Sequence, residues 1–246
     1  MNSADLERVR ARVRDARSIV VLTGAGMSAE SGIATFRDAL TGLWSRFDPE
    51  QLASEEGFRA RPQLVWDWYA ERRDGVRRAQ PNAGHLALAS FARRRPGVLT
   101  LVTQNVDDLH QRAGNVDAIR LHGDILQDRW LDACERRCDV AQAKPGRPPN
   151  CASCSNLVRP AVVWFGEMLS EAALDAAELA TRQCEVMLVV GTSGVVWPAA
   201  GLASLARRCA AHVIIVNPNA SDIDADAHVV LHGTAAAVLP EVLTVD

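Results

Sequence analysis

Two glycines that follow an apolar run near the N-terminus have a spacing that could hold a dinucleotide. The run SIVVLT leads into GAGMSA, so that Gly24, Gly26 and Ala29 form a Gly-x-Gly-x-x-Ala pattern. A buried strand that ends in glycines lets the backbone turn sharply and approach a phosphate closely, beside a helix N-terminus. By itself the pattern is weak support for a nucleotide site, because glycine-rich turns also follow strands for structural reasons.

The sequence after this turn departs from that of an ordinary dehydrogenase. Such a fold would continue with a long helix and a second strand that ends in an acid. Here Gly32 and Gly42 interrupt any long helix, and no strand-like run follows before residue 97. We therefore expect the nucleotide to be held in an unusual way, beneath a flexible loop that contains Phe36 and Arg37.

A second polar segment, TQNVDDLHQRAG, follows another apolar run. Side chains at the carboxyl end of a parallel strand are where α/β folds bind ligands. Gln104, Asn105 and Asp107 are suited to hydrogen-bonding an amide and a ribose, and His122 comes soon after, beside Gly123. Each residue also has an ordinary explanation, as a helix cap or a structural histidine. Their combination is what indicates a ligand site.

Four cysteines have the spacing of a structural zinc site. They form the pattern C-x3-C-x12-C-x2-C at Cys134, Cys138, Cys151 and Cys154. Two short loops that each supply two thiolates fit one tetrahedral ion, and four sulfur ligands leave no open position for a catalytic water. The stretch AKPGRPPN between the pairs cannot form a hydrophobic core, so it needs a cross-link such as a bound metal ion. The alternative is a set of unrelated buried or redox cysteines.

Composition excludes several classes of protein. A chain of 246 residues that is 48% hydrophobic can bury a large core, as one domain plus an insertion. A net charge of −3 gives no basic field for nucleic acid. No apolar run reaches the ~20 residues of a membrane span, and the N-terminal segment resembles an amphipathic surface helix more than a secretion signal. We expect a cytoplasmic protein, in a compartment that keeps thiols reduced.

Strand-like and helix-like segments alternate along the chain. This alternation predicts an α/β fold with a Rossmann-like, doubly wound parallel sheet. The expected buried strands are residues 19–22, 98–102, 186–190, 213–216 and 229–231, and the expected helices are residues 82–94, 171–182, 199–208 and 234–239.

Two segments break this rhythm, the Trp-rich residues 42–80 and the cysteine-containing residues 126–168. We expect them to form a smaller helical and zinc-binding domain, with the active cleft between it and the sheet. The nucleotide-binding domain would then comprise residues 1–41, 81–125 and 169–246.

Taken together and in this order, the motifs resemble those of the sirtuins, the NAD-dependent protein-lysine deacylases. The resemblance runs from about Val20 to Leu239. It rests on GAGMSAESGIATFRD, TQNVDDLHQRAG, LHG, the two cysteine pairs, RPAVVWFGE, GTSGVVWPAA and VNPN. The chain departs from the family pattern at Ala34, where proline is usual, and in the first cysteine pair, which is one residue wider than is common.

The resemblance implies a transfer reaction in which NAD is consumed. An acyl-lysine protein or peptide would react with NAD to give nicotinamide, O-acyl-ADP-ribose and free lysine. His122 would be the general base that activates a ribose hydroxyl, while Asn105 and Asp107 would orient the nicotinamide ribose and carboxamide. The other implied NAD-binding residues are Gly24, Ala25, Gly26, Ser28, Phe36, Arg37, Gln104, Val106, Gly191, Thr192, Ser193, Asn217, Pro218, Asn219 and Ala235. The resemblance also implies one structural zinc ion. It implies no nucleic-acid partner and no membrane partner. It leaves the oligomeric state open, and a monomer is plausible.

Tyr69 and Arg72 indicate which acyl group is removed. Being three residues apart on a predicted helix, they share a face, and an arginine fork with a phenol suits a carboxylate. Tyr-x-x-Arg resembles the sirtuin subgroup that removes succinyl, malonyl and glutaryl groups, and Ala53 matches a position that this subgroup keeps small. We expect some deacetylase activity as well. The alternative is that Arg72 is a solvated helix residue.

Two other functions remain open from the sequence. A mono-ADP-ribosyltransferase would use the same cleavage of NAD with a protein side chain as acceptor. A non-catalytic, NAD-sensing module would use the zinc ribbon to hold a partner. The presence of His122 together with Asn105 and Asp107 counts against the second alternative, because a sensor needs no base.

Overall fold

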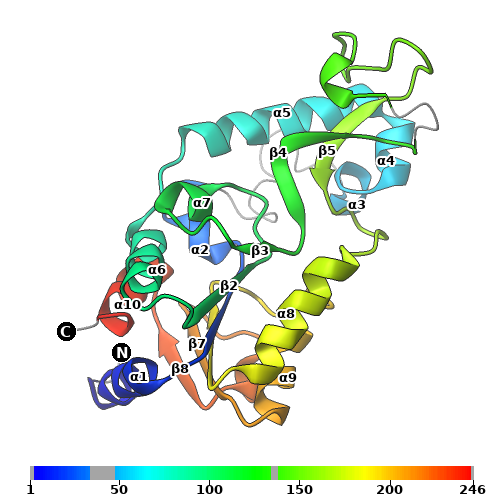
Figure 1. Ribbon diagram of the computed structural model, residues 1–246. Coiled ribbons are helices and arrows are strands. Elements are labelled where there is room, and N and C mark those ends of the chain that lie inside the picture. Colours follow the sequence, from blue (N-terminus) through cyan, green and yellow to red (C-terminus); the bar gives the residue numbers. More distant parts are fainter. Residues whose placement is uncertain (1–2, 34–47, 134–137, 245–246) are drawn as a thin grey trace.

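The larger part of the molecule is a parallel sheet covered by helices on both faces. The computed structural model describes residues 3–33, 48–133 and 138–244. Six parallel strands have the order β3-β2-β1-β6-β7-β8 (Figure 1). Their bounds are β1 Ile19–Thr23, β2 Leu99–Thr103, β3 Ile119–Arg120, β6 Val186–Val190, β7 His212–Asn217 and β8 Val229–His232. The predicted Rossmann-like α/β fold is confirmed.

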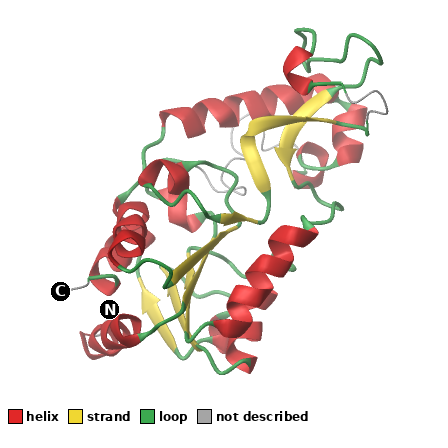
Figure 2. Ribbon diagram, viewed as in Figure 1, coloured by secondary structure: helices red, strands yellow, loops and turns green. Residues whose placement is uncertain are grey.

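The central strands are apolar throughout because both faces of the sheet are covered. Alternate residues of β1 point to opposite sides, so Val21 packs in one core cluster and Val20 in another. The first cluster contains residues of α1 (Ser3–Asp15), α6 (Ala83–Arg94) and α10 (Ala235–Val242). The second contains residues of α8 (Glu171–Gln183) and α9 (Gly201–Arg208) (Figure 2).

Three of the helices that cover the sheet, α6, α8 and α10, begin at capping residues that the sequence provides. The Asn82 side chain accepts hydrogen bonds from the backbone of Gly84 and His85 at the start of α6. Ser170 caps α8 and Thr234 caps α10 in the same way. Such caps satisfy backbone donors that have no partner within the helix. All four predicted helices are present, and none of their ends differs from the prediction by more than three residues.

A second packing unit lies beyond the carboxyl ends of the strands (Figure 1). It combines the antiparallel pair β4 (Gly123–Trp130) and β5 (Val158–Val162) with three helices. These are α3 (Pro49–Leu52), α4 (Glu55–Ala60) and α5 (Pro62–Arg78). Buried side chains from these helices and from both strands share one apolar cluster, whose members include Leu52, Phe58, Trp68, Ile125 and Val162. The domain boundary expected after residue 125 falls within β4, since this strand starts at Gly123.

The other short elements among the described residues lie in connecting segments. Helix α2 (Gly26–Ala29) follows β1, and α7 (Leu109–Ala113) lies between β2 and β3. The 3₁₀ turns Val140–Gln142 and Asp224–Asp226 lie between β4 and β5 and between β7 and β8. Among the described helices, none combines the length and the apolar character that a membrane crossing requires.

Truncating a side chain at the centre of the sheet should strongly destabilise the fold. Leu188 on β6 is fully buried, whereas Leu179 on α8 is 57% exposed. Leu188→Ala should lower the free energy of unfolding by about 2–5 kcal/mol, through lost burial and the cavity that remains. Leu179→Ala should change it by about 0.5 kcal/mol or less. Urea denaturation measures both, and equal midpoints would contradict this packing.

Candidate active site

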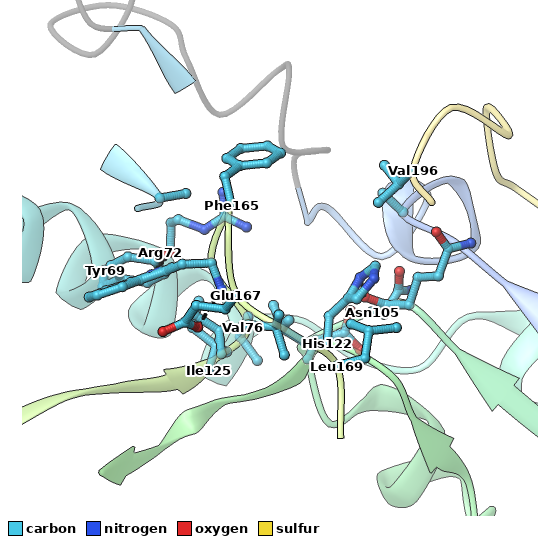
Figure 3. A pocket seen from close by; sticks show the side chains of 18 of the residues that line it. Tyr69, Arg72, Val76, Asn105, His122, Ile125, Phe165, Glu167, Leu169 and Val196 are labelled. Atoms are coloured by element: carbon cyan, nitrogen blue, oxygen red, sulfur yellow. Dashed lines mark hydrogen bonds between the residues drawn. The ribbon is translucent and has the colours of Figure 1, made fainter. Parts of the chain in front are cut away.

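A cavity of about 1480 Å³ lies where the second packing unit meets the carboxyl ends of β1 and β2. Its walls come from the start of α2, the loop after β2, helix α5 and the segment after β5. Figure 3 shows His122 and Asn105 near one end of this cavity and Tyr69 and Arg72 near the other. Several residues predicted to act together are therefore within one cavity.

Three polar side chains are linked by hydrogen bonds at the sheet end of the cavity. The Asn105 amide nitrogen donates to Ser28 Oγ at 3.1 Å, and Ser28 Oγ donates to Asp107 Oδ2 at 2.9 Å. The other carboxylate oxygen of Asp107 accepts from the Leu109 backbone N–H at 3.0 Å. Burial raises the pKa of Asp107, and these hydrogen bonds oppose that rise. The cluster presents a buried amide and carboxyl group to a ligand.

Arg120, which the sequence analysis did not single out, holds the loop that carries this cluster. Its Nη2 donates to the carbonyl oxygens of Val106 and Asp107, both at 2.9 Å, and its Nη1 donates to Asp124 Oδ2 at 2.7 Å. Two consecutive carbonyl groups are thus fixed by one planar guanidinium. In the sequence, Arg120 is an arginine two residues before His122. Its role could not be predicted there, because its hydrogen-bond partners are brought together only by the fold.

His122 lines the cavity as a neutral imidazole. Its Nδ1 lies 3.0 Å from the carbonyl oxygen of Gln104. A carbonyl oxygen can only accept, so Nδ1 carries the proton and Nε2 keeps its lone pair. Burial lowers the pKa of His122, more than the hydrogen bond to Gln104 raises it. The geometry leaves a basic nitrogen beside the polar cluster.

The glycine turns meet at the adjacent edge of the sheet. Gly26 N–H donates to the Gly191 carbonyl oxygen at 2.8 Å, and Gly191 has a φ of +62°. A Cβ on Gly191 would lie 2.4 Å from the Met27 nitrogen, so only glycine fits this approach. Gln104 Nε2 donates to Thr192 Oγ1 at 3.1 Å, which links this edge to the loop after β2.

The predicted NAD-binding residues divide into two groups. Those that line the cavity are Ala25, Ser28, Gln104, Asn105, Val106 and Asp107. Those outside its lining, on or next to the ends of β1, β6, β7 and β8, are Gly24, Gly26, Gly191, Thr192, Ser193, Asn217, Pro218, Asn219 and Ala235. Asn217 Nδ2 donates to the Thr192 carbonyl oxygen at 2.8 Å, so β6 and β7 are linked at this edge. Phe36 and Arg37, like Ala34, lie outside the described residues.

At the far end of the cavity, Tyr69, Arg72 and Ala53 all contribute to the wall. The Arg72 guanidinium lies over the Trp68 ring, 4.7 Å from its centroid. Burial raises the pKa of Tyr69 to about 12 and lowers that of Arg72. Arg72 is thus part of the cavity wall, where it is half-buried. This end offers a phenol and a cation in partly apolar surroundings.

The loop after β5 lines the cavity, although no site role was expected for it. The guanidinium of Arg159, which is fully buried, lies 3.3 Å from the Trp164 ring centroid and binds both carboxylate oxygens of Glu167. Glu167 Oε2 also accepts from the Trp164 backbone N–H at 2.8 Å. Burial raises the pKa of Glu167, but these hydrogen bonds lower it below its ordinary value. The motif RPAVVWFGE contained these residues, but not their contacts.

Three of the four cysteines of the predicted zinc site lie together. The sulfur atoms of Cys138, Cys151 and Cys154 are within 4.8 Å of one another. The Ser153 backbone N–H donates to Cys151 Sγ at 3.5 Å. This bond, together with hydrogen bonds from Cys154 and Cys138, lowers the pKa of Cys151 to about 7. Cys134 lies outside the described residues. Three converging thiols are compatible with a structural zinc site.

Known proteins are similar to this chain in sequence. The Sir2 family model matches residues 24–198. An "NAD-dependent protein deacylase" of Ralstonia nicotianae is 56% identical over 236 residues, which cover 96% of this chain and 95% of that relative. A protein with the same description from Methylococcus capsulatus is 51% identical, with 96% and 95% covered.

Solved structures of Sir2 proteins are similar to this chain in fold and in sequence. A Sir2 homologue in complex with NAD has a TM-score of 0.87 at 41% identity, with 96% of this chain and 92% of that chain covered. Sir2Tm bound to a propionylated peptide has a TM-score of 0.82 at 28% identity, with 97% of both chains covered. The chain described here belongs to the Sir2 family.

Proposed function

We propose that this protein is an NAD-dependent protein-lysine deacylase, which moves the acyl group of an acyl-lysine side chain onto ADP-ribose and releases nicotinamide and free lysine. The observation that carries the proposal is the neutral His122 beside the Ser28–Asn105–Asp107 cluster in one cavity. The names of the relatives and the NAD and peptide complexes of the structural neighbours support it.

The residues present fit NAD. Asn105 and Asp107 would bind the nicotinamide carboxamide and ribose, since together they offer a donor and acceptors in a buried place. Bound NAD would supply a sugar carbon with nicotinamide as its leaving group. The residues at the ends of β1, β6 and β7 would contact the phosphates and the adenosine, with the backbone at Ala235 contacting the adenine. Phe36 and Arg37 would cover the reacting sugar and exclude water.

His122 would act as the general base. A proton from a ribose hydroxyl would move to Nε2, because Nδ1 is already occupied by the bond to Gln104. The lowered pKa of His122 keeps the ring neutral at pH 7. A non-catalytic sensor has no use for such a base. An ADP-ribosyltransferase would instead leave ADP-ribose on a protein, which mass spectrometry of the products distinguishes.

Tyr69 and Arg72 would select acyl groups that end in a carboxylate, with deacetylation retained at a lower level. A phenol and a guanidinium at the same end of the cavity suit a succinyl, malonyl or glutaryl tail. Ala53, whose side chain is a single methyl group, would leave room for the longer chain. Purified protein, NAD and a panel of acyl-lysine peptides test the whole proposal, with nicotinamide and O-acyl-ADP-ribose as the measured products.

Cys134 would complete a zinc site with the three clustered thiols, and the ion would be structural. Residues 42–80 and 126–168 would form the smaller domain, which the ion stabilises. Because such thiols persist in a reducing compartment, we place the protein in the cytoplasm. Its partners would be acylated proteins, with neither nucleic acid nor membrane required.

Removing the base should stop turnover and leave NAD binding intact. His122→Ala should lower kcat by about 10²–10⁴-fold, while the Kd for NAD measured by calorimetry stays close to that of the wild type. In the wild type, kcat/KM should fall as pH drops through a value below the ordinary histidine pKa, because protonation removes the base. His212→Ala, at the other end of the sheet, is the control. Near-normal turnover by the His122 variant would refute the assignment.

Replacing Arg72 should change which acyl group is preferred. Arg72→Met should reduce kcat/KM for succinyl-lysine peptides roughly a hundredfold or more, as one charge-assisted pair is lost, and should affect acetyl-lysine peptides far less. Arg77→Met is the matched control, since Arg77 is on the same helix, exposed, and paired with Asp74. Equal losses on both substrates would exclude Arg72 as the selector.

Metal analysis should find zinc in the purified protein at about one ion per chain. Cys151→Ser should remove the metal and lower the melting temperature, because metal binding and folding of the small domain are coupled. Cys209→Ser should keep the metal, since Cys209 is outside the cluster. A metal-free wild type that melts as a single, stable unit would contradict the structural role.

A further inference from the structure

The phenol of Tyr69 is held by a residue from a different part of the chain. Trp164 Nε1 lies 2.9 Å from Tyr69 Oη, and the two residues are 95 positions apart in the sequence. Both are almost completely buried, and their ring centroids are 6.4 Å apart. A buried polar contact of this kind fixes the orientation of the groups that make it.

The direction of this hydrogen bond determines where the phenol proton points. An indole N–H can only donate, so Tyr69 Oη is the acceptor and its own proton must go elsewhere. Within the described ranges, Tyr69 makes no other hydrogen bond. Tyr69 and Arg72 both line the cavity, and Figure 3 shows them on neighbouring positions of α5. Both groups can therefore offer donors to one ligand.

Besides its contacts with α5, Trp164 is held by residues from other segments. Its backbone N–H donates to Glu167, and the buried Arg159 guanidinium lies against its ring. Phe58 packs on the same ring at a centroid distance of 5.3 Å. The indole N–H thus comes from the segment after β5, and the groups that hold its ring include three that lie outside the helix carrying Tyr69.

We propose that Trp164 is a positioning residue for acyl-group selection. Its indole N–H donates to the oxygen of the Tyr69 hydroxyl, so that the hydroxyl proton is directed to the carboxylate of an acidic acyl tail. The inference rests on the proposed preference for acidic acyl groups. It adds that the preference depends on the loop after β5 as well as on α5.

Trp164→Phe tests the inference, because the variant keeps an aromatic ring and the backbone bond to Glu167 but lacks the N–H. The KM for succinyl-lysine peptides should rise about three- to tenfold, the usual effect of one hydrogen bond, with kcat and the acetyl-lysine parameters changing less than about twofold. Trp66→Phe is the matched control, since Trp66 is on α5 but outside the cavity lining. Equal changes on both substrates would overturn the inference.

A double-mutant cycle tests the coupling directly. Tyr69→Phe should selectively impair succinyl-lysine peptides, and adding Trp164→Phe to it should cause no further selective loss, because the hydroxyl to be positioned is gone. Additive selective losses would show that Trp164 acts independently of Tyr69. Tyr69→Phe without any loss on succinyl-lysine would also overturn the inference, whether or not the Trp164 variant folds.

Tyr69 is the single tyrosine among 246 residues, which provides a spectroscopic readout. The tyrosine Fermi doublet in UV resonance Raman spectra reports whether this hydroxyl accepts a hydrogen bond. Trp164→Phe should shift the doublet intensity ratio away from the acceptor state, and Trp66→Phe should leave it unchanged. An unchanged ratio in Trp164→Phe would contradict the contact.

The outcomes separate this inference from the proposed acyl preference. If the wild type and Arg72→Met show no preference for succinyl-lysine over acetyl-lysine, the preference and the inference both fail. If Arg72→Met loses a preference that Trp164→Phe retains in full, the acyl preference stands and the role of Trp164 is refuted.

Discussion

The hydrogen bond between His122 Nδ1 and the Gln104 carbonyl oxygen is the contact on which the site depends. It determines which ring nitrogen is free, and it joins the segment before β4 to the loop after β2. Arg120 makes two more bonds to the same loop, and the Ile125 backbone N–H makes another to the Val106 carbonyl oxygen. The imidazole of His122 and the amide of Asn105, for which we propose roles as base and ligand-binding group, are therefore kept in fixed relation by one short stretch of backbone.

The same arrangement explains how so many polar groups are tolerated in a buried place. Asn105 and Asp107 are almost fully enclosed, and each is hydrogen-bonded to Ser28. Beneath them, Thr23 Oγ1 donates to Thr103 Oγ1, which also accepts from the Asn105 backbone N–H. Burying polar groups is unfavourable unless they are paired in this way. The pairing makes the loop rigid, which is what a binding site for a small polar group needs.

The far wall of the cavity is stabilised differently. An apolar cluster that includes Phe58, Trp68 and Trp164 surrounds the ion pair between Arg159 and Glu167. A buried ion pair contributes little net stability but strongly penalises arrangements that break it. We infer that this pair specifies one conformation of the loop after β5, and with it the shape of the end of the cavity that Tyr69 and Arg72 line.

The sequence indicated the fold and most of the polar cluster because those features leave local marks. Strands buried on both faces are continuous apolar runs, and the glycine turn and the cysteine pairs have recognisable spacings. The strands β3, β4 and β5 left no such mark. The first has two residues, the second contains a register shift and mostly polar residues, and the third contains Pro160.

Taken alone, the sequence determined the parallel sheet, the pairing of glycine turn with polar loop, the lone histidine beside Gly123 and the position of Tyr69 and Arg72 on one helical face. Tertiary structure alone decided which nitrogen of His122 is free, that Arg120 clamps the loop after β2, and that Trp164 reaches Tyr69 across 95 residues. The physical reason is that local patterns reflect burial and backbone geometry within a segment. Hydrogen bonds between distant segments depend on the direction in which each side chain emerges, and only the packed chain sets that direction.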